Sequence, residues 1–133
     1  MNRYRCLTLV VVALTTVQSV RSAGYAAPAK DTVVLQRVPV TGTDRQLGMG
    51  IAEFPPNSAK PRQKADGPEV VYVIEGEVTV QIEGQPAVTF RAGETFKLAA
   101  DVVHRTTAGP SGAKVVAAWV HTPGRQFNFP TPD

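Results

Sequence analysis

Short runs of apolar and β-branched residues, separated by turn-forming residues, recur along the chain between residues 33 and 121. Such runs are typical of β-strands joined by tight turns. No stretch shows the 3.6-residue spacing of an amphipathic helix. The pattern predicts an all-β domain with strands at 33–38, 47–54, 69–75, 77–83, 87–91, 95–98, 102–107 and 114–121. Short strands at this spacing favour a sandwich, a barrel or a jelly roll.

Two of the predicted strands are apolar on both faces. Residues 70–74 and 115–120 contain almost no polar side chain, whereas residues 78–82 alternate between apolar and polar. A strand with one solvated face alternates, and a strand covered on both sides need not. One face of each run can fill the barrel, so the other face must meet a second subunit or the N-terminal strand. We therefore expect a homodimer, with an N-terminal strand folded over the barrel as the alternative.

The N-terminal segment has the features of a secretory signal peptide. Arg3 and Arg5 precede an apolar run at 6–17, which is too short for a membrane span, and small residues follow it. We expect residues 1–26 to be removed, with cleavage after Ser22, Gly24 or Ala26. An uncleaved anchor is the alternative. Residues 27–133 then form a single exported domain, periplasmic or secreted, with no stable membrane anchor.

Removal of the signal peptide changes the charge of the protein. The whole chain has 14 basic and 11 acidic residues, and the segment contains three of the basic ones (Arg3, Arg5 and Arg21) and no acidic one, which leaves 11 of each. A neutral domain lacks the clustered basic charge that nucleic acid requires. Cys6, the chain's single cysteine, is also lost, which excludes disulfides and cysteine nucleophiles from the mature protein.

The candidate chemistry lies between residues 57 and 108. Glu69, Gly76, Gly93 and His104 are spaced as in two motifs, G-x5-H-x-H-x3,4-E-x6-G and G-x5-P-x-G-x2-H-x3-N. In this respect the chain resembles the cupin superfamily, in particular the small single-domain cupin 2 type. The other motif positions hold different residues: Asn57 stands for a glycine, Gln63 and Ala65 for the two histidines, and Ala99, Asp101 and Ala108 for proline, glycine and asparagine. The resemblance implies a cupin-type jelly roll, or double-stranded β-helix barrel.

The same resemblance implies a metal site that has lost ligands. Glu69 and His104 are its matched ligands, Gln63 offers a weaker amide oxygen, and Ala65 offers none. A triad of two histidines and one carboxylate cannot be assembled from these positions. We therefore expect no tightly held cofactor, with weak binding of a divalent transition metal as the remaining option. The spacing does not place His121, the other histidine, at this site.

Strand alternation places Glu69, Val71 and Val73 on one face of their strand, and His104 and Thr106 on one face of another. If both faces point inward, Glu69 and His104 form a hydrogen-bonded pair that raises the pKa of the imidazole. Lys60, Arg62 and Lys64 form a basic run before this site. A solvated loop is the favoured interpretation of the run, and a guide for an anionic ligand is the alternative. The tail, residues 126–132, is expected to cover the barrel mouth or an edge.

The leading hypothesis is an exported cupin barrel that binds a small molecule at Gln63, Glu69 and His104. The alternative is a metal-dependent cupin enzyme, dioxygenase- or isomerase-like, that uses the same three residues. A third option is a scaffold protein whose closed barrel binds no ligand. Catalytic residues and the identity of the small molecule do not follow from the sequence.

Overall fold

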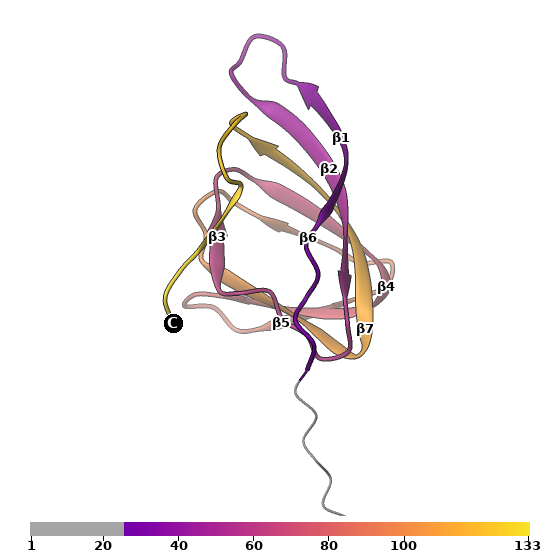
Figure 1. Cartoon of the computed structure of the whole chain (residues 1–133). Helices are drawn as coiled ribbons and strands as arrows, with labels where there is room; N and C mark the ends of the chain where they lie inside the picture. The colour runs from indigo at the N-terminus through magenta and orange to yellow at the C-terminus, as the bar shows by residue number, and fades with distance from the viewer. Residues whose placement is uncertain (1–25) are drawn as a thin grey trace, which may run out of the picture.

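A computed structural model describes residues 26–133 (Figure 1). The regular elements of these residues are all strands, which confirms the all-β prediction: β1 Val33–Pro39, β2 Gln46–Phe54, β3 Gln63–Ala65, β4 Glu69–Ile82, β5 Val88–Arg91, β6 Thr95–Leu98, β7 His104–His121 and β8 Asn128–Pro130. Nothing in this part of the chain forms a helix that could span a membrane. The predicted signal peptide lies outside the described residues, apart from Ala26, and stays a prediction.

The strands form one antiparallel sheet that curls back on itself (Figure 1). The two long strands, β4 and β7, run side by side through its middle. The first half of β4 pairs with the second half of β7, and these halves are flanked by β6 and β2. The second half of β4 pairs with the first half of β7, and these halves are flanked by β5 and β3. The sheet therefore presents two walls that face each other.

Each of the two long strands bends where the sequence predicted a turn. Gly76 in β4 has φ of 71° and Gly112 in β7 has φ of 73°, a left-handed conformation that glycine adopts without steric cost. The β4–β7 register shifts between Val73 and Glu75 and again between Gly76 and Val78. Such bulges bend a strand without ending it. The prediction of separate strands at 69–75 and 77–83, and at 102–107 and 114–121, was therefore wrong.

The bends also change which residues point inward. In β4 the buried residues are Val71 and Val73 before the bend and Val78 and Val80 after it. In β7 they include His104 and Thr106 before the bend, and every second residue from Val115 to His121 after it. Simple alternation therefore holds within each half-strand but not across the bend.

Two strands were missed by the sequence pattern. β3 and β8 have three residues each and lack an apolar run, and they pair with each other. The tail comes to the inner side of the sheet, where Phe127 packs against the core and its ring lies 5.6 Å from the Trp119 indole. The expectation that the tail covers the barrel is thus confirmed.

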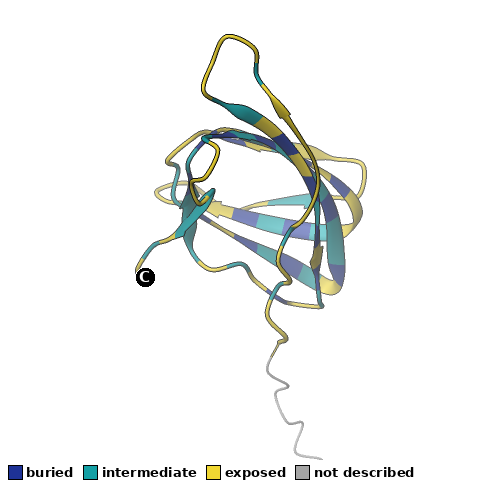
Figure 2. Cartoon of the chain, turned by 45° about the horizontal axis from the view of Figure 1, so that its top comes forward, coloured by how far each residue is buried: buried dark blue, intermediate teal, exposed yellow. Residues whose placement is uncertain are grey.

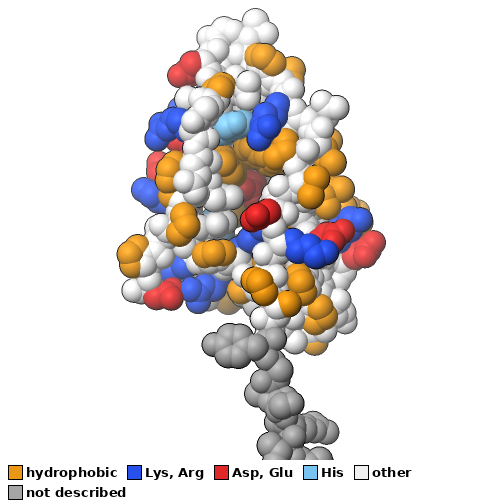
Figure 3. Space-filling view, viewed as in Figure 1, with side chains coloured by type: hydrophobic (Ala, Val, Ile, Leu, Met, Phe, Trp, Pro, Cys, Tyr) orange, Lys and Arg blue, Asp and Glu red, His pale blue; other side chains and the backbone are white. Residues whose placement is uncertain are grey.

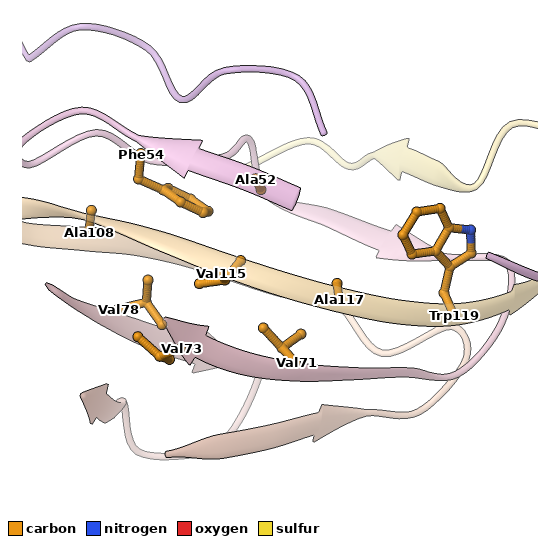
Figure 4. Packing of buried hydrophobic residues seen from close by; sticks show 9 residues of the cluster. All are labelled: Ala52, Phe54, Val71, Val73, Val78, Ala108, Val115, Ala117 and Trp119. Carbon is orange, nitrogen blue, oxygen red and sulfur yellow. The ribbon is translucent and has the colours of Figure 1, made fainter. Parts of the chain in front are cut away.

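The core lies along the inner face of the sheet, and several of its residues also face the cavity described below. Buried and more exposed residues alternate along most of β2 and β4 (Figure 2). Figure 4 shows the cluster between β2, β4 and β7, with Phe54 and Ala108 towards one end and Trp119 at the other. Its nine buried members are Ala52, Phe54, Val71, Val73, Val78, Ala108, Val115, Ala117 and Trp119. Each fully buried valine contributes about 1.5–3 kcal/mol.

Within residues 26–133, no segment covers the outer face of the β2–β7–β4 wall. Val70 is 57% exposed, Tyr72 45% and Met49 40%. β1 pairs with the edge of β2, so it extends the sheet and does not cover these side chains. β1, the first strand of the described residues, therefore does not fold over this apolar face, contrary to the alternative.

Candidate functional site

A cavity of about 470 Å³ opens between the inner face of the sheet, the segment before β1 and the C-terminal tail. Its hollow is visible in Figure 3, with apolar side chains on its walls and charged ones at its rim. The apolar wall includes Phe54, Val71, Phe96, Trp119 and Phe127. Ligand cavities in proteins have about this volume and this mixture of apolar walls and a few polar groups.

The three predicted site residues all line this cavity. Gln63 in β3 lies directly opposite His104 in β7. Glu69, the first residue of β4, lies between Leu98 of β6 and Trp119 of β7. The inner faces of both long strands therefore point into one space, as strand alternation predicted. Their roles as ligand or metal contacts stay a prediction.

The backbone supports the motif register that carries the resemblance. Asn57 has φ of 58° and Asp101 has φ of 62°, and in residues 26–133 these are the non-glycine residues with positive φ. Both stand where the family motifs have glycine. Asn and Asp tolerate the left-handed conformation better than other side chains. Both turns therefore have the left-handed conformation that glycine adopts most readily, although neither position holds glycine.

Glu69 and Lys60 both line the cavity, and the charge of each acts on the other. Burial raises the pKa of Glu69 to about 7, and the positive charge of Lys60 opposes this shift. Burial likewise lowers the pKa of Lys60, against the charges of Asp31 and Glu69. The Lys60 ammonium also lies 5.9 Å from the centre of the Phe54 ring. At neutral pH the Glu69 carboxyl can therefore accept or donate a proton.

His104 is buried and its orientation is fixed by the backbone. Its Nδ1 lies 3.0 Å from the Val102 carbonyl oxygen, which can only accept, so Nδ1 carries the hydrogen. Nε2 of the neutral ring is then left as an acceptor. Burial lowers the pKa of His104, although the Val102 carbonyl opposes the shift. The ring is therefore neutral at pH 7.

The expected Glu69–His104 pair is not formed. Among the described residues neither a hydrogen bond nor an ion pair joins these two side chains, and the pKa of His104 is lowered where the pair would raise it. Burial removes water from both side chains, and no hydrogen bond between them replaces that water. Each is left to interact with whatever occupies the cavity.

The side chains at this site do not form the ligand set of a tightly held metal ion. Within residues 26–133 no three His, Cys, Asp or Glu side chains gather closely enough to hold one. Ala65, at the second histidine position, is buried and has no donor atom. Catalytic metal sites use at least three protein ligands. The expectation of weak or absent metal binding remains to be tested.

The sequence did not place several of the cavity residues there, among them Lys60, Arg37 and His121. Lys60 lines the cavity. The other two residues of the basic run form ion pairs, Arg62 with Glu83 at 2.5 Å and Lys64 with Asp101 at 3.4 Å. The interpretation of the run as a solvated loop therefore holds only in part. His121 and Arg37 line the cavity as well. The bend in β7 gives His121 the same inward direction as His104. The sequence did contain a sign of this, because His121 is two residues beyond Trp119 and so shares its face of the strand.

Comparison with known proteins agrees with this geometry. A family model for the cupin domain matches residues 50–121, more than half of the chain. The chain belongs to the cupin family. This confirms the expected cupin-type jelly roll. It also confirms the resemblance to cupins that was inferred from the two motifs.

One curated relative is dimethylsulfoniopropionate lyase DddW from Ruegeria pomeroyi. It is 35% identical to this cupin over 81 residues, which are 59% of this chain and 53% of the relative. The chain thus spans about half the length of that protein.

Solved structures show the same fold. Dimethylsulfoniopropionate lyase DddQ from Ruegeria pomeroyi matches with a TM-score of 0.59 and 16% identity, over 64% of this cupin and 43% of that chain. Oxalate oxidase in complex with the substrate analogue glycolate matches with a TM-score of 0.51 and 23% identity, over 58% and 46%. At these identities the likeness concerns the fold alone.

Proposed function

We propose that this cupin is an exported protein that binds a small organic molecule in its cavity without a tightly held metal. The observation that carries the proposal is the cavity itself, which has room for a small ligand and brings Gln63, Glu69 and His104 together. The export part rests on the signal-like N-terminal sequence.

The polar groups of the cavity suit a ligand with hydrogen-bonding atoms. His104 Nε2 is a free acceptor, the Glu69 carboxyl can donate or accept near neutral pH, and Lys60 is a donor. Away from water, hydrogen bonds to such groups are stronger than at the surface. The apolar walls would bury the hydrocarbon part of the same molecule. This combination favours an occupied cavity over the scaffold alternative.

Trp119 gives a direct test because it is the single tryptophan of the chain and lines the cavity. A library of small acids, amides, sugars and amines can be screened by the change in its fluorescence. We expect at least one chemical class to bind, and the Ala117→Leu variant to lose that binding because the new side chain fills the cavity. Ala118→Leu, on the opposite face of the same strand, is the matched control. Full binding by Ala117→Leu would contradict the proposal.

A second candidate is an enzyme. Its support is a carboxyl group with a pKa of about 7 in the same cavity as a neutral histidine, since acid–base catalysis works best with a pKa near the working pH. A metal-dependent dioxygenase- or isomerase-like activity at Gln63, Glu69 and His104 is one form. A lyase activity like that named for DddW is another. Incubation with dimethylsulfoniopropionate, followed by proton NMR with and without added divalent metals, would show consumption of that compound only for an active lyase.

We also propose that a second copy of the chain covers the open outer face. A groove of about 580 Å³ on this face is lined by Met49, Val70, Tyr72, Phe96 and Val116. Exposed apolar patches of this kind mark interaction sites. The supporting observation is that β1 leaves the face uncovered.

A further inference from the structure

The cavity has a second polar region around His121. Arg37, His121 and Arg125 all line the cavity. The charges that act on His121 are those of Arg37 and Asp66, whereas the charge that acts on Glu69 is that of Lys60. Figure 3 shows a histidine between basic side chains at one side of the opening. The region around His121 is therefore electrostatically distinct from that around Glu69.

His121 is buried with an unused polar atom. Its side chain belongs to a residue that is 6% exposed, and its Nδ1 has no hydrogen-bond partner among residues 26–133. An unsatisfied buried polar atom destabilises a fold. Burial and the charge of Arg37 both lower the pKa of His121, and Asp66 opposes them. An anion in the cavity would offset the positive charge of Arg37 and supply an acceptor for the imidazole.

The positive charge of this region exceeds its negative charge. Asp66 accepts a hydrogen bond from the Thr122 amide and lies 3.4 Å from Arg125 and 3.7 Å from Arg45. Asp66 therefore serves two guanidinium groups, of which Arg45 also lies 3.6 Å from the exposed Asp44. Arg37 forms no ion pair with any residue in the described part of the chain. Its charge is available to a ligand.

The floor of this region is aromatic. The Trp119 and Phe127 rings lie 5.6 Å apart, and the His121 ring meets Phe127 edge-on at 6.1 Å. In the sheet, Arg37 lies opposite Gly48, which lies opposite Trp119. Because Gly48 has no side chain, the indole extends over it towards Arg37. An anion held by Arg37 would thus have its neighbouring carbon atoms on an apolar surface.

We infer that Arg37, His121 and Arg125 form a subsite for the carboxylate of a small organic acid, with the hydrocarbon part of the acid lying against Trp119 and Phe127. Guanidinium groups bind carboxylates through two parallel hydrogen bonds, which suits this assignment. The aromatic floor favours an organic acid over an inorganic anion. The inference rests on the proposed function, because it names the ligand class for the same cavity.

The test compares the binding of 3-phenylpropionate with that of the uncharged 3-phenylpropionamide. Binding to the full-length mature protein is measured by the change in Trp119 fluorescence. We expect the acid to bind about tenfold more tightly than the amide. Arg37→Gln should weaken binding of the acid about tenfold and leave that of the amide unchanged. Arg91→Gln is the matched control, because Arg91 is an exposed arginine that pairs with Glu77 on β4 and does not line the cavity.

A second variant, His121→Leu, separates binding from folding. Removing an unsatisfied buried nitrogen should leave the free energy of unfolding unchanged or higher. The same change should weaken binding of the acid several-fold, since it removes a donor from the anion. A variant that folds as well as the wild type and binds the acid equally well would overturn the role of His121.

The outcomes distinguish this inference from the proposed function. Equal binding of acid and amide, insensitive to Arg37→Gln, would overturn the carboxylate subsite and leave ligand binding in the cavity intact. Displacement of the acid by equimolar inorganic phosphate would overturn the preference for an organic acid. If neither compound alters Trp119 fluorescence, the subsite is contradicted, and the proposed function then depends on the wider library.

Discussion

Gln63 of β3 lies directly opposite His104 of β7, with both side chains in the lining of the cavity. Gln63 stands where the first family motif has a histidine, so an imidazole at this position would face the same space as His104 and Glu69. The amide keeps the hydrogen-bonding capacity of the position but removes a strong metal ligand. The proposal that this cupin binds a small molecule without a tightly held metal rests in part on this position.

Restoring that ligand should create a metal site. Gln63→His would place two imidazoles and the Glu69 carboxylate around one space, the ligand set of many metal sites. We expect binding of Ni²⁺ or Zn²⁺ to tighten by about 100-fold or more over the wild type, measured by calorimetry. Gln81→His, at an exposed position of β4, is the control. A tight site in the wild type that His104→Ala abolishes would contradict this prediction and favour the enzyme hypothesis.

Glu69 should make the stability of the fold depend on pH. Below its ordinary pKa of 4.5 the carboxyl is protonated in both folded and unfolded states. Between 4.5 and about 7 the unfolded chain releases the proton and the folded chain keeps it, so the free energy of unfolding decreases as pH rises. Each unit of pKa difference is worth about 1.4 kcal/mol, so the decrease reaches about 3 kcal/mol above pH 7.

Glu69→Gln should remove this decrease. The difference in unfolding free energy between wild type and variant, measured with denaturant at pH 4.5 and pH 8, isolates the contribution of Glu69 from those of His104 and His121. The two histidines act in the opposite direction, because their lowered pKa values destabilise the fold as pH falls. Glu75→Gln, at an exposed position of the same strand, is the control. An unchanged difference at the two pH values would show that Glu69 is not buried as described.

Gly48 should be essential for the position of Trp119. A Cβ atom at residue 48 would lie 2.6 Å from the indole, closer than real contacts allow. Gly48→Ala should therefore displace the ring, cost about 1–3 kcal/mol of stability and shift the Trp119 emission. Met49→Ala, on the outer face of the same strand, should leave the emission unchanged. Unshifted emission in Gly48→Ala would mean that the indole does not lie over β2.

A charge on the open face should dissociate the proposed dimer. Val70 lies in the apolar groove and is 57% exposed, so Val70→Glu costs little stability in a monomer but places a carboxylate in the interface. We expect analytical ultracentrifugation to show a dimer for the wild type and a monomer for the variant. Val88→Glu, exposed on β5 outside the groove, is the matched control and should remain a dimer. A monomeric wild type at high concentration would contradict the proposal.

The sequence predicts the inner faces of the half-strands but not how they join. Strand geometry places Glu69, Val71 and Val73 on one face, because the alternation of side chains is a local property of a strand. The bulges around Gly76 and the bend at Gly112 depend on pairing between residues distant in the chain. Glycine-containing segments predict a turn as readily as a bend.

The same limit explains the unexpected site residues. His121 and His104 lie at opposite ends of β7, and only the bend directs both into one cavity. Lys60 precedes β3, a strand too short to show a pattern. The family motifs supplied Gln63, Glu69 and His104, but Arg37 and His121 belong to no motif and are brought together by the sheet.

Native mass spectrometry of the protein purified from its own compartment tests the central claim most directly. It reports in one spectrum the mass of the chain, the mass of any molecule retained in the cavity, and any metal. We predict a chain that carries a small organic molecule and no transition metal, with the molecule absent from Ala117→Leu and present in Ala118→Leu. One metal ion per chain, or a molecule retained equally by both variants, would contradict the account.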